Sequence, residues 1–194
     1  MGTSEEQPPT VDEAMRATNR AHHLPPDQQA YAGLDRALPI GHGQTNSQPS
    51  TVRAMLTALD ARSGHRVLDV GAGSGWTTVI LALIVGYTGR VFGVELVPQL
   101  AEWGRANVEF AGLPWATEQE AAPGQLGLPA EAPFDRILVS AAAKVVPQPL
   151  VDQLAPDGVM VVPVRGQLVK VRPGHEPEPL GRYVFVPLID PGQE

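Results

Sequence analysis

The chain has 194 residues, of which 43% are hydrophobic and 18% charged, a balance typical of one globular domain with a substantial core. The formal net charge of -7 argues against nucleic acid as the main partner, because a phosphate backbone attracts a basic surface. The chain contains no cysteine, which excludes disulfides, thiolate nucleophiles and cysteine-based metal sites.

The first segments of the chain read as a tail and two helical pieces. Residues 1–10 are polar and acidic and lack the apolar core of a signal peptide, so we expect a loose tail. Val11–Arg20 has helical apolar spacing, and Gln28–Asp35 allows a short second helix. Between them, Ala21–Asp27 contains His22-His23 and two prolines and predicts a turn. No further ligands are spaced around the two histidines, so no metal site is predicted.

The segment Leu38–Pro49 is rich in glycine, proline and amide side chains, which predicts a loop rather than the interior of an element. A polar loop just before a core helix is a candidate ligand-facing segment. We expect Ser50 to cap the helix Thr51–Ala61 and Ser63-Gly64 to mark its end.

The stretch from Val67 to Glu95 predicts a βαβ unit. A short apolar run is followed by three glycines in the turn Gly71–Gly75, an apolar helix, and a second strand with Glu95 at its carboxyl end. Glycine lets the backbone adopt positive φ and approach a ligand closely. An acid about two dozen residues after the first glycine is placed to bind the hydroxyls of a ribose. The unit therefore predicts a ligand that carries an adenosine-like ribose.

The glycine spacing decides between ligand classes. A dinucleotide fingerprint reads G-x-G-x-x-G. Here the pattern is G-x-G-x-G, and Trp76 occupies the position where that fingerprint has glycine. This form resembles motif I of the class I S-adenosylmethionine-dependent methyltransferases. The alternative is a glycine turn in a non-binding α/β domain.

The second half of the chain is less regular. A helix is expected from Glu95 to Ala111, whereas Trp115–Ala122 lacks the β-branched pattern of a third strand. The helix's expected core contacts are Leu96, Leu100, Trp103, Val108 and Phe110. Val159–Val162 and Leu168–Val171 predict strands, and Arg172–Gly181 predicts an exposed loop. The most apolar stretch, Val79–Val85, is too short to span a bilayer.

Two segments give the chain a specific family resemblance. Pro39–Pro49 resembles the P-I-G-x-G-Q-T-I-S-x-P loop of the protein-L-isoaspartate O-methyltransferases, and Ala132–Ala143 resembles their strand and A-A-A loop. The resemblance implies an α/β fold: a doubly wound, Rossmann-like methyltransferase sandwich. Its sheet would be mostly parallel with an antiparallel C-terminal hairpin, and Phe185–Leu188 would be its closing strand. We expect one domain made of a tail (1–10), a helical segment with the substrate and cofactor loop (11–62), and an S-adenosylmethionine-binding core (63–190).

The resemblance also implies a set of site residues, with no metal among them. Ser47 and Thr45 would hydrogen-bond the reacting carboxylate. The cofactor-binding residues would be Asp69, Gly71, Ala72, Gly73, Ser74, Gly75, Glu95 and Leu96. The substrate cleft would be lined by Ile40, Gly41, His42, Ser140, Ala141 and Ala142. Because a carboxylate with a pKa near ~4 is already ionised at neutral pH, this chemistry needs orientation rather than a general base.

Three positions depart from the family pattern. Asn46 stands where the family prefers isoleucine, and His23 where it has an aromatic residue, both in the region of the substrate cleft. Pro123 stands where the family has an aspartate that helps to hold the adenine. Proline offers no side-chain acceptor, and Glu118 or Glu120 is a candidate to compensate.

The resemblance implies a repair-type carboxyl methyltransferase that uses S-adenosyl-L-methionine, releases S-adenosyl-L-homocysteine and acts on L-isoaspartyl residues of damaged proteins or peptides. We expect a cytoplasmic monomer that engages neither membrane nor nucleic acid. Two alternatives remain: an enzyme dedicated to the aspartate of one peptide, and a catalytically weak binding protein with the same fold.

Overall fold

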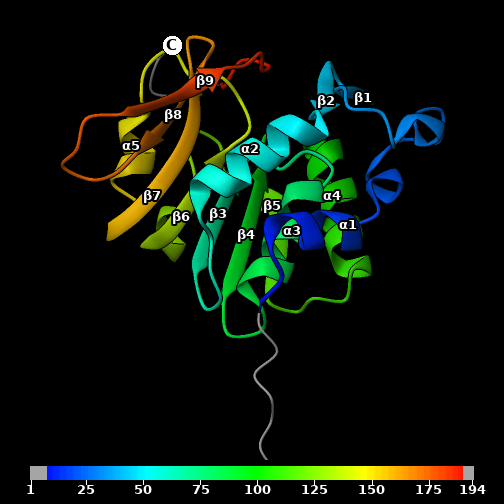
Figure 1. Ribbon diagram of the computed structural model, residues 1–194, viewed down its shortest axis with the longest axis horizontal. Helices are drawn as coiled ribbons and strands as arrows, with labels where there is room; N and C mark the ends of the chain where they lie inside the picture. The colour runs from blue at the N-terminus through cyan, green and yellow to red at the C-terminus, as the bar shows by residue number, and fades with distance from the viewer. Residues whose placement is uncertain (1–7, 190–194) are drawn as a thin grey trace, which may run out of the picture.

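The computed structural model describes residues 8–189 and is built around a seven-stranded sheet with the order β5-β4-β3-β6-β7-β8-β9 (Figure 1). The strands are β3 (Arg66–Val70), β4 (Arg90–Glu95), β5 (Ala116–Glu120), β6 (Phe134–Val139), β7 (Leu154–Val164), β8 (Gln167–Val171) and β9 (Glu178–Arg182). Neighbouring strands in the part β5-β4-β3-β6-β7 pair in parallel, whereas β7 with β8 and β8 with β9 pair antiparallel. The predicted mostly parallel sheet with an antiparallel C-terminal hairpin is therefore confirmed.

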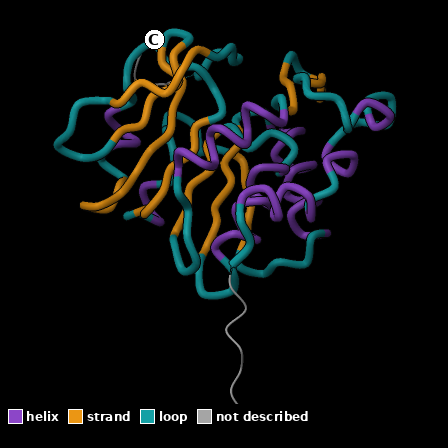
Figure 2. Tube along the Cα trace, viewed as in Figure 1, coloured by secondary structure: helices purple, strands orange, loops and turns teal. Residues whose placement is uncertain are grey.

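Helices cover the two faces of the sheet unequally. The helices are α1 (Val11–Ala17), α2 (Pro49–Leu59), α3 (Trp76–Val85), α4 (Pro98–Phe110) and α5 (Gln148–Val151), with 3-10 turns η1 (Arg20–His23), η2 (Gln29–Tyr31) and η3 (Pro129–Glu131). Buried residues of α1 to α4 share one core with the sheet, and α5 packs into the second core on the other face (Figures 1 and 2). The N-terminal helices thus belong to the same core as the sheet. No helix within residues 8–189 is long and apolar enough to cross a bilayer.

The predicted βαβ unit is present and forms the centre of the fold. Strand β3 lies between β4 and β6, with Val70 opposite both Val94 and Val139. Its residues Val67–Val70 are buried, as expected for a parallel strand covered on both faces. Helix α3 is buried along nearly its whole length, which explains its uniformly apolar sequence. The carboxyl ends of β3, β4 and β6 therefore meet at one edge of the sheet, where such folds bind ligands.

The segment that we predicted as a loop contains a short β-hairpin. Strands β1 (Leu38–Gly41) and β2 (Gln44–Asn46) pair antiparallel, away from the main sheet (Figure 2). The turn between them has three successive residues with positive φ, Gly41, His42 and Gly43, and two of these are glycines that adopt it without strain. The glycines that argued against a regular element therefore form its turn.

The boundaries around α2 also differ from the prediction. The helix begins at Pro49 and receives no side-chain cap from Ser50, whose backbone N–H instead donates to Asp35 at 2.8 Å. It ends at Leu59, where Asp60 takes a left-handed conformation, rather than at Ser63-Gly64. In the turn predicted from Ala21 to Asp27, η1 occupies the first residues.

Strand β5 occupies the segment that lacked a strand pattern. It pairs with β4 in full register, from Val91 opposite Ala116 to Glu95 opposite Glu120. In the loop predicted from Arg172 to Gly181, the last residues form most of β9, whereas the expected closing strand Phe185–Leu188 makes only an isolated bridge through Pro187.

Helix α4 starts at Pro98, after Glu95 has ended β4, so the helix expected from Glu95 begins three residues later. Leu100 and Val108 are buried as expected, and Trp103 is partly buried. Leu96 and Phe110 are exposed, so their predicted core contacts are wrong.

Candidate active site

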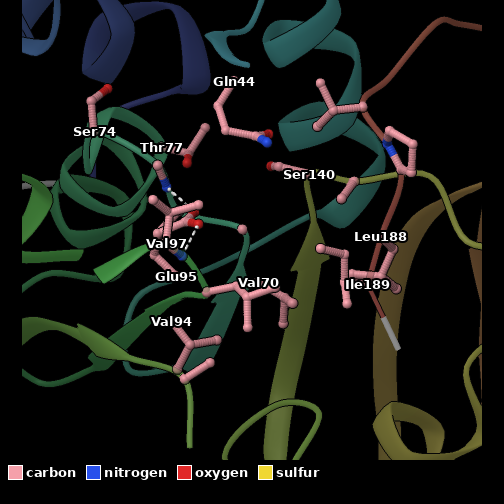
Figure 3. Close-up of a pocket in the computed structure, with 18 of the residues that line it drawn as sticks. Gln44, Val70, Ser74, Thr77, Val94, Glu95, Val97, Ser140, Leu188 and Ile189 are labelled. Atoms are coloured by element: carbon pink, nitrogen blue, oxygen red, sulfur yellow. Dashed lines mark hydrogen bonds between the residues drawn. The ribbon is translucent and has the colours of Figure 1, made fainter. Parts of the chain in front are cut away.

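One pocket lies at the carboxyl edge of the parallel strands. Segments from all parts of the chain line it: Ile40, Gln44–Ser47, Val70–Ser74, Trp76, Thr77, Val94–Val97, Ala121, Ala122, Gly124–Gly127, Ser140, Ala141 and Val186–Ile189. Figure 3 shows Gln44 from the hairpin and Ser140 from the end of β6 pointing into the same opening, with Glu95 and Val97 at its other side. The pocket therefore joins the polar hairpin, the glycine turn and the end of β4.

The backbone conformation of the glycine turn favours glycine at three positions. Gly71, Gly73 and Gly75 all have positive φ, which a residue with a side chain rarely adopts. A Cβ at Gly73 would lie 3.2 Å from the Ile40 side chain, and one at Gly75 only 3.0 Å from the Gly104 carbonyl oxygen. The turn leads directly into α3, whose first N–H groups have no side-chain cap.

Glu95 is held in place by backbone donors. The Gly73 N–H donates to its Oε2 at 2.9 Å, and the Val97 N–H donates to its Oε1 at 2.9 Å, as the dashed lines in Figure 3 show. Only 7% of Glu95 is exposed, yet it lines the pocket. Each carboxylate oxygen keeps a free lone pair, so the group can accept two further hydrogen bonds from a ligand.

Asp69 lies beneath the turn rather than in the pocket. It is fully buried, and its Oδ2 accepts hydrogen bonds from the hydroxyls of Thr77 and Thr78 at 2.6 and 2.8 Å. Burial raises the pKa of Asp69 to about 6, although those two hydroxyls oppose the rise. The side chain therefore ties β3 to the first turn of α3 and supports the glycine turn from below.

The hairpin formed by β1 and β2 is held in place by a buried arginine. Arg20 is 6% exposed, and its Nε donates to the Asn46 Oδ1 at 2.8 Å. Its two terminal nitrogens donate to the backbone carbonyls of Ala32, Leu34, Arg36, Asn46 and Ser47. Burial lowers the pKa of Arg20 to about 10, which still leaves it charged at neutral pH. The guanidinium also lies 5.2 Å from the ring centre of Trp76 at the start of α3.

Two of the departures from the family pattern meet at Ser74. The Asn46 Nδ2 donates to the Ser74 hydroxyl at 3.2 Å, and a His23 ring nitrogen lies 2.8 Å from the Ser74 carbonyl oxygen. Burial lowers the pKa of His23, which favours a neutral ring that donates through Nδ1. The same carbonyl accepts from Asn107 of α4 at 2.9 Å. Asn46 and His23, which were predicted in the region of the substrate cleft, thus both bind the glycine turn through Ser74.

The pocket brings most of the predicted site residues together. Ser47, Thr45, Ile40, Ser140 and Ala141 line it with the predicted cofactor residues Gly71–Ser74, Glu95 and Leu96. The predicted site residues Gly41, His42, Asp69, Gly75 and Ala142 are not among its lining residues. For Ala142 the structure gives a different contact, because its backbone exchanges two hydrogen bonds with the C-terminal residues Val186 and Leu188.

Sequence reasoning placed the loop around Pro123 near the cofactor but named none of the residues that line the pocket there, and it missed the C-terminal wall. The loop after β5 contributes Ala121, Ala122 and Gly124–Gly127, and the C-terminal segment Val186–Ile189 closes the side opposite the glycine turn. Position alone could have indicated the first wall, because it follows the strand next to β4 at the same edge of the sheet. Pro123 is exposed and does not line the pocket, although both of its neighbours do.

Neither acid considered as a replacement at the Pro123 position lines the pocket. Glu118 is buried under the glycine turn, and Glu120 is exposed at the end of β5. The expectation that one of them compensates is therefore not supported by the geometry.

Comparison with known proteins identifies the family to which this chain belongs. Residues 4–190 match the family model described as protein-L-isoaspartate(D-aspartate) O-methyltransferase. Protein-L-isoaspartate O-methyltransferases from Aeropyrum pernix and Myxococcus xanthus are 46% and 42% identical, each over 92% of this chain and over 72% and 87% of their own lengths. A candidate protein-L-isoaspartate O-methyltransferase from Plasmodium falciparum, crystallised with S-adenosyl-L-homocysteine, has the same fold, with a TM-score of 0.80 at 24% identity over 93% of this chain and 90% of that one. The chain belongs to the protein-L-isoaspartate(D-aspartate) O-methyltransferase family.

Proposed function

We propose that the chain is a carboxyl O-methyltransferase that uses S-adenosyl-L-methionine to esterify L-isoaspartyl residues of damaged proteins or peptides. The observation that carries the proposal is the shared pocket: Thr45 and Ser47 of the hairpin line the same cavity as the glycine turn and Glu95. A methyl donor held by the turn and a carboxylate held by the hairpin would thus meet in one place.

The residues of the pocket fit an S-adenosyl group. Glu95 offers two carboxylate oxygens to the two vicinal hydroxyls of a ribose, and the apolar side chains of Val97 and Leu126 beside it suit the flat face of a purine. Glu95 is the one charged side chain among the described residues that line the pocket. An acidic lining suits the cationic sulfonium of S-adenosylmethionine. The glycine spacing, with Trp76 where the dinucleotide fingerprint has glycine, favours that cofactor over a nicotinamide dinucleotide.

The chain's own residues supply orientation. S-adenosyl-L-methionine supplies a transferable methyl group when bound, and the products are a methyl ester and S-adenosyl-L-homocysteine. The substrate carboxylate is ionised at neutral pH and needs no base, so the hydroxyls of Ser47 and Thr45 need only hydrogen-bond and aim it. Ser140 and Ala141 are small and leave room for a peptide at the end of β6. The ester then cyclises to a succinimide without help from the enzyme.

The structure supports a general repair enzyme over one dedicated to a single peptide. Asn46 and the altered N-terminal segment motivated the second possibility. Asn46 and His23 are 4% exposed each, and both are engaged with Arg20 or Ser74. These two departures therefore have an internal explanation that requires no special substrate.

We also propose that the enzyme acts in the cytoplasm as a monomer and does not engage nucleic acid or membrane. The net charge of -7 supports the absence of a nucleic-acid partner, because a polyanion would be repelled. The absence of cysteine fits a reducing compartment.

The proposal is tested by comparing Ser47→Ala with the wild-type chain. With labelled S-adenosylmethionine and an isoaspartyl peptide, we expect Ser47→Ala to lower kcat by at least tenfold. Calorimetry should show S-adenosyl-L-homocysteine affinity within a few-fold of wild type, because the partner of Ser47 is the reacting carboxylate. Ser50→Ala, on the exposed first turn of α2, is the matched control and should behave as wild type. Wild-type protein that fails to bind S-adenosyl-L-homocysteine at millimolar concentration would refute both enzyme hypotheses.

A further inference from the structure

Among the described residues, the one direct hydrogen bond between the Thr45–Ser47 loop and the glycine turn Gly71–Gly75 comes from the side chain of Asn46. Asn46 comes immediately before Ser47 and lies opposite Leu38 in the hairpin. Its amide oxygen accepts from the Arg20 Nε at 2.8 Å, and its amide nitrogen donates to the Ser74 hydroxyl at 3.2 Å. Asn46 and its two partners come from three separate parts of the chain, so no local element would bring them together.

The orientation of the Asn46 amide is fixed by chemistry. A guanidinium carries only donors, so the atom that faces Arg20 must be the amide oxygen. The amide nitrogen then points to Ser74, whose hydroxyl oxygen accepts. The amide can therefore join Arg20 to Ser74 in one orientation only. Asn46 is 4% exposed, so water does not compete effectively for these hydrogen bonds.

Arg20 sets the position of the whole hairpin end. Its Nη2 donates to the carbonyl of Ser47 at 2.9 Å and to that of Asn46 at 3.3 Å. Nη2 and Nη1 also donate to carbonyls of the segment that precedes the hairpin, at Arg36 and at Ala32 and Leu34 respectively. The guanidinium makes no ion pair within 4 Å among the described residues, and its hydrogen-bond acceptors there are all carbonyl oxygens. Such a group has few alternative arrangements, because every donor that moved would lose a buried acceptor.

We propose that Asn46 is a positioning residue, which works with Arg20 to hold the Thr45–Ser47 loop at a fixed position relative to Ser74 of the glycine turn. The role deepens the proposed methyl transfer and rests on it. Asn46 need not touch the reacting atoms. It determines where the Ser47 hydroxyl stands relative to a ligand on the glycine turn, and misplacement by about 1 Å at a reacting centre costs on the order of 100-fold in rate.

The test compares two asparagines that bind different atoms of the same serine: Asn46 binds the Ser74 hydroxyl, and Asn107 binds the Ser74 carbonyl. Asn46→Leu removes the link between loop and turn, whereas Asn107→Leu removes a 2.9 Å bond from α4 to the Ser74 carbonyl without touching the loop. Amide hydrogen exchange of the ligand-free protein over residues 38–48 should be at least tenfold faster in Asn46→Leu and close to wild type in Asn107→Leu. With saturating isoaspartyl peptide and S-adenosylmethionine, Asn46→Leu should lose roughly 10- to 100-fold in kcat, and Asn107→Leu should instead raise the Kd for S-adenosyl-L-homocysteine.

Asn46→Asp provides a rescue. An aspartate of the same shape still accepts from Arg20, and the Ser74 hydroxyl can turn to donate to it, so kcat and exchange should recover to within about threefold of wild type. Equal impairment of Asn46→Asp and Asn46→Leu would overturn the proposal, as would wild-type exchange in Asn46→Leu. If Asn46→Leu does not fold, Ser74→Ala removes only the second half of the link. Faster exchange over 38–48 is expected there, and unchanged exchange overturns the proposal. A wild-type chain that methylates no isoaspartyl peptide would refute the proposed function alone, because the exchange comparison does not depend on activity.

Discussion

Glu118 is a buried acid without a hydrogen-bond partner among the described residues, and we expect it to make the free energy of unfolding depend on pH. It is 2% exposed, and neither carboxylate oxygen has a partner among the described residues. Three glycines make room for it: a Cβ at Gly75 or Gly93 would lie within about 3 Å of its side chain, and one at Gly104 would overlap the carboxyl group. Burial raises the pKa of Glu118 to about 9, and the nearby carboxylates of Asp69 and Glu95 add to the rise.

The sign of the pH effect follows from linkage. The folded-state pKa of Glu118 lies above its ordinary value of 4.5, so the folded chain binds a proton that the unfolded chain releases. The contribution of Glu118 to the free energy of unfolding is therefore highest below pH 4.5, falls as the pH rises, and is lost above about 9. Each pH unit within that window removes about 1.4 kcal/mol, so between about pH 6 and about pH 9 the loss is at most about 4 kcal/mol.

Urea unfolding at these two pH values measures the effect. Glu118→Gln keeps the shape and cannot ionise, so its free energy of unfolding should vary less with pH than that of wild type, by up to about 4 kcal/mol over this range. The difference between the two proteins cancels contributions from histidines and other groups. Glu120→Gln, an exposed change on the same strand, is the matched control and should keep the wild-type slope. Parallel slopes for wild type and Glu118→Gln would show that Glu118 is ionised in the folded chain and would refute the reasoning.

Three further predictions concern the same region. Gly104→Ala should destabilise the wild-type chain because its methyl group overlaps the Glu118 carboxyl, but in a Glu118→Ala background it should stabilise by about 0.5–1 kcal/mol through helix propensity, as thermal unfolding would show. Glu95→Ala should weaken S-adenosyl-L-homocysteine binding by at least tenfold in calorimetry, since it removes the ribose acceptor and leaves the Gly73 and Val97 N–H groups without partners; unchanged affinity would contradict the assigned ribose site. Pro123→Asp should tighten that binding, by as much as about 1.5–3 kcal/mol if the aspartate reaches the adenine amino group, and weaker binding would show that this loop recognises adenine in another way.

The central βαβ unit could be predicted because its signals are local. The buried run before Gly71, the glycine spacing and the position of Glu95 lie within thirty or so neighbouring residues, and a parallel strand buried on both faces has a recognisable composition. The same holds for the hydrophobic face of α2.

Strand β5 could not be predicted from its own residues. Ala116, Glu118 and Glu120 are residue types depleted in strands, and they form one because β4 presents a full parallel ladder beside them. Glu118 is accommodated only because glycines from β4, α4 and the cofactor turn leave space. Such a compensation joins residues far apart in sequence.

The roles of Asn46 and His23 also depend on contacts between residues far apart in sequence. Ser74 lies 28 residues from Asn46 and 51 from His23, and no spacing rule connects them. The sequence therefore indicated the positions that depart from the family pattern but not what the departures do.

The most direct test of the central claim is a methylation assay with isomeric peptides. Two peptides of unrelated sequence, each made with L-isoaspartyl or with ordinary L-aspartyl at one position, are incubated with labelled S-adenosyl-L-methionine, and base-labile methyl ester is counted. We expect ester on both isoaspartyl peptides and none above background on their aspartyl counterparts. Ester on neither isoaspartyl peptide, from a protein shown to bind S-adenosyl-L-homocysteine, would contradict it.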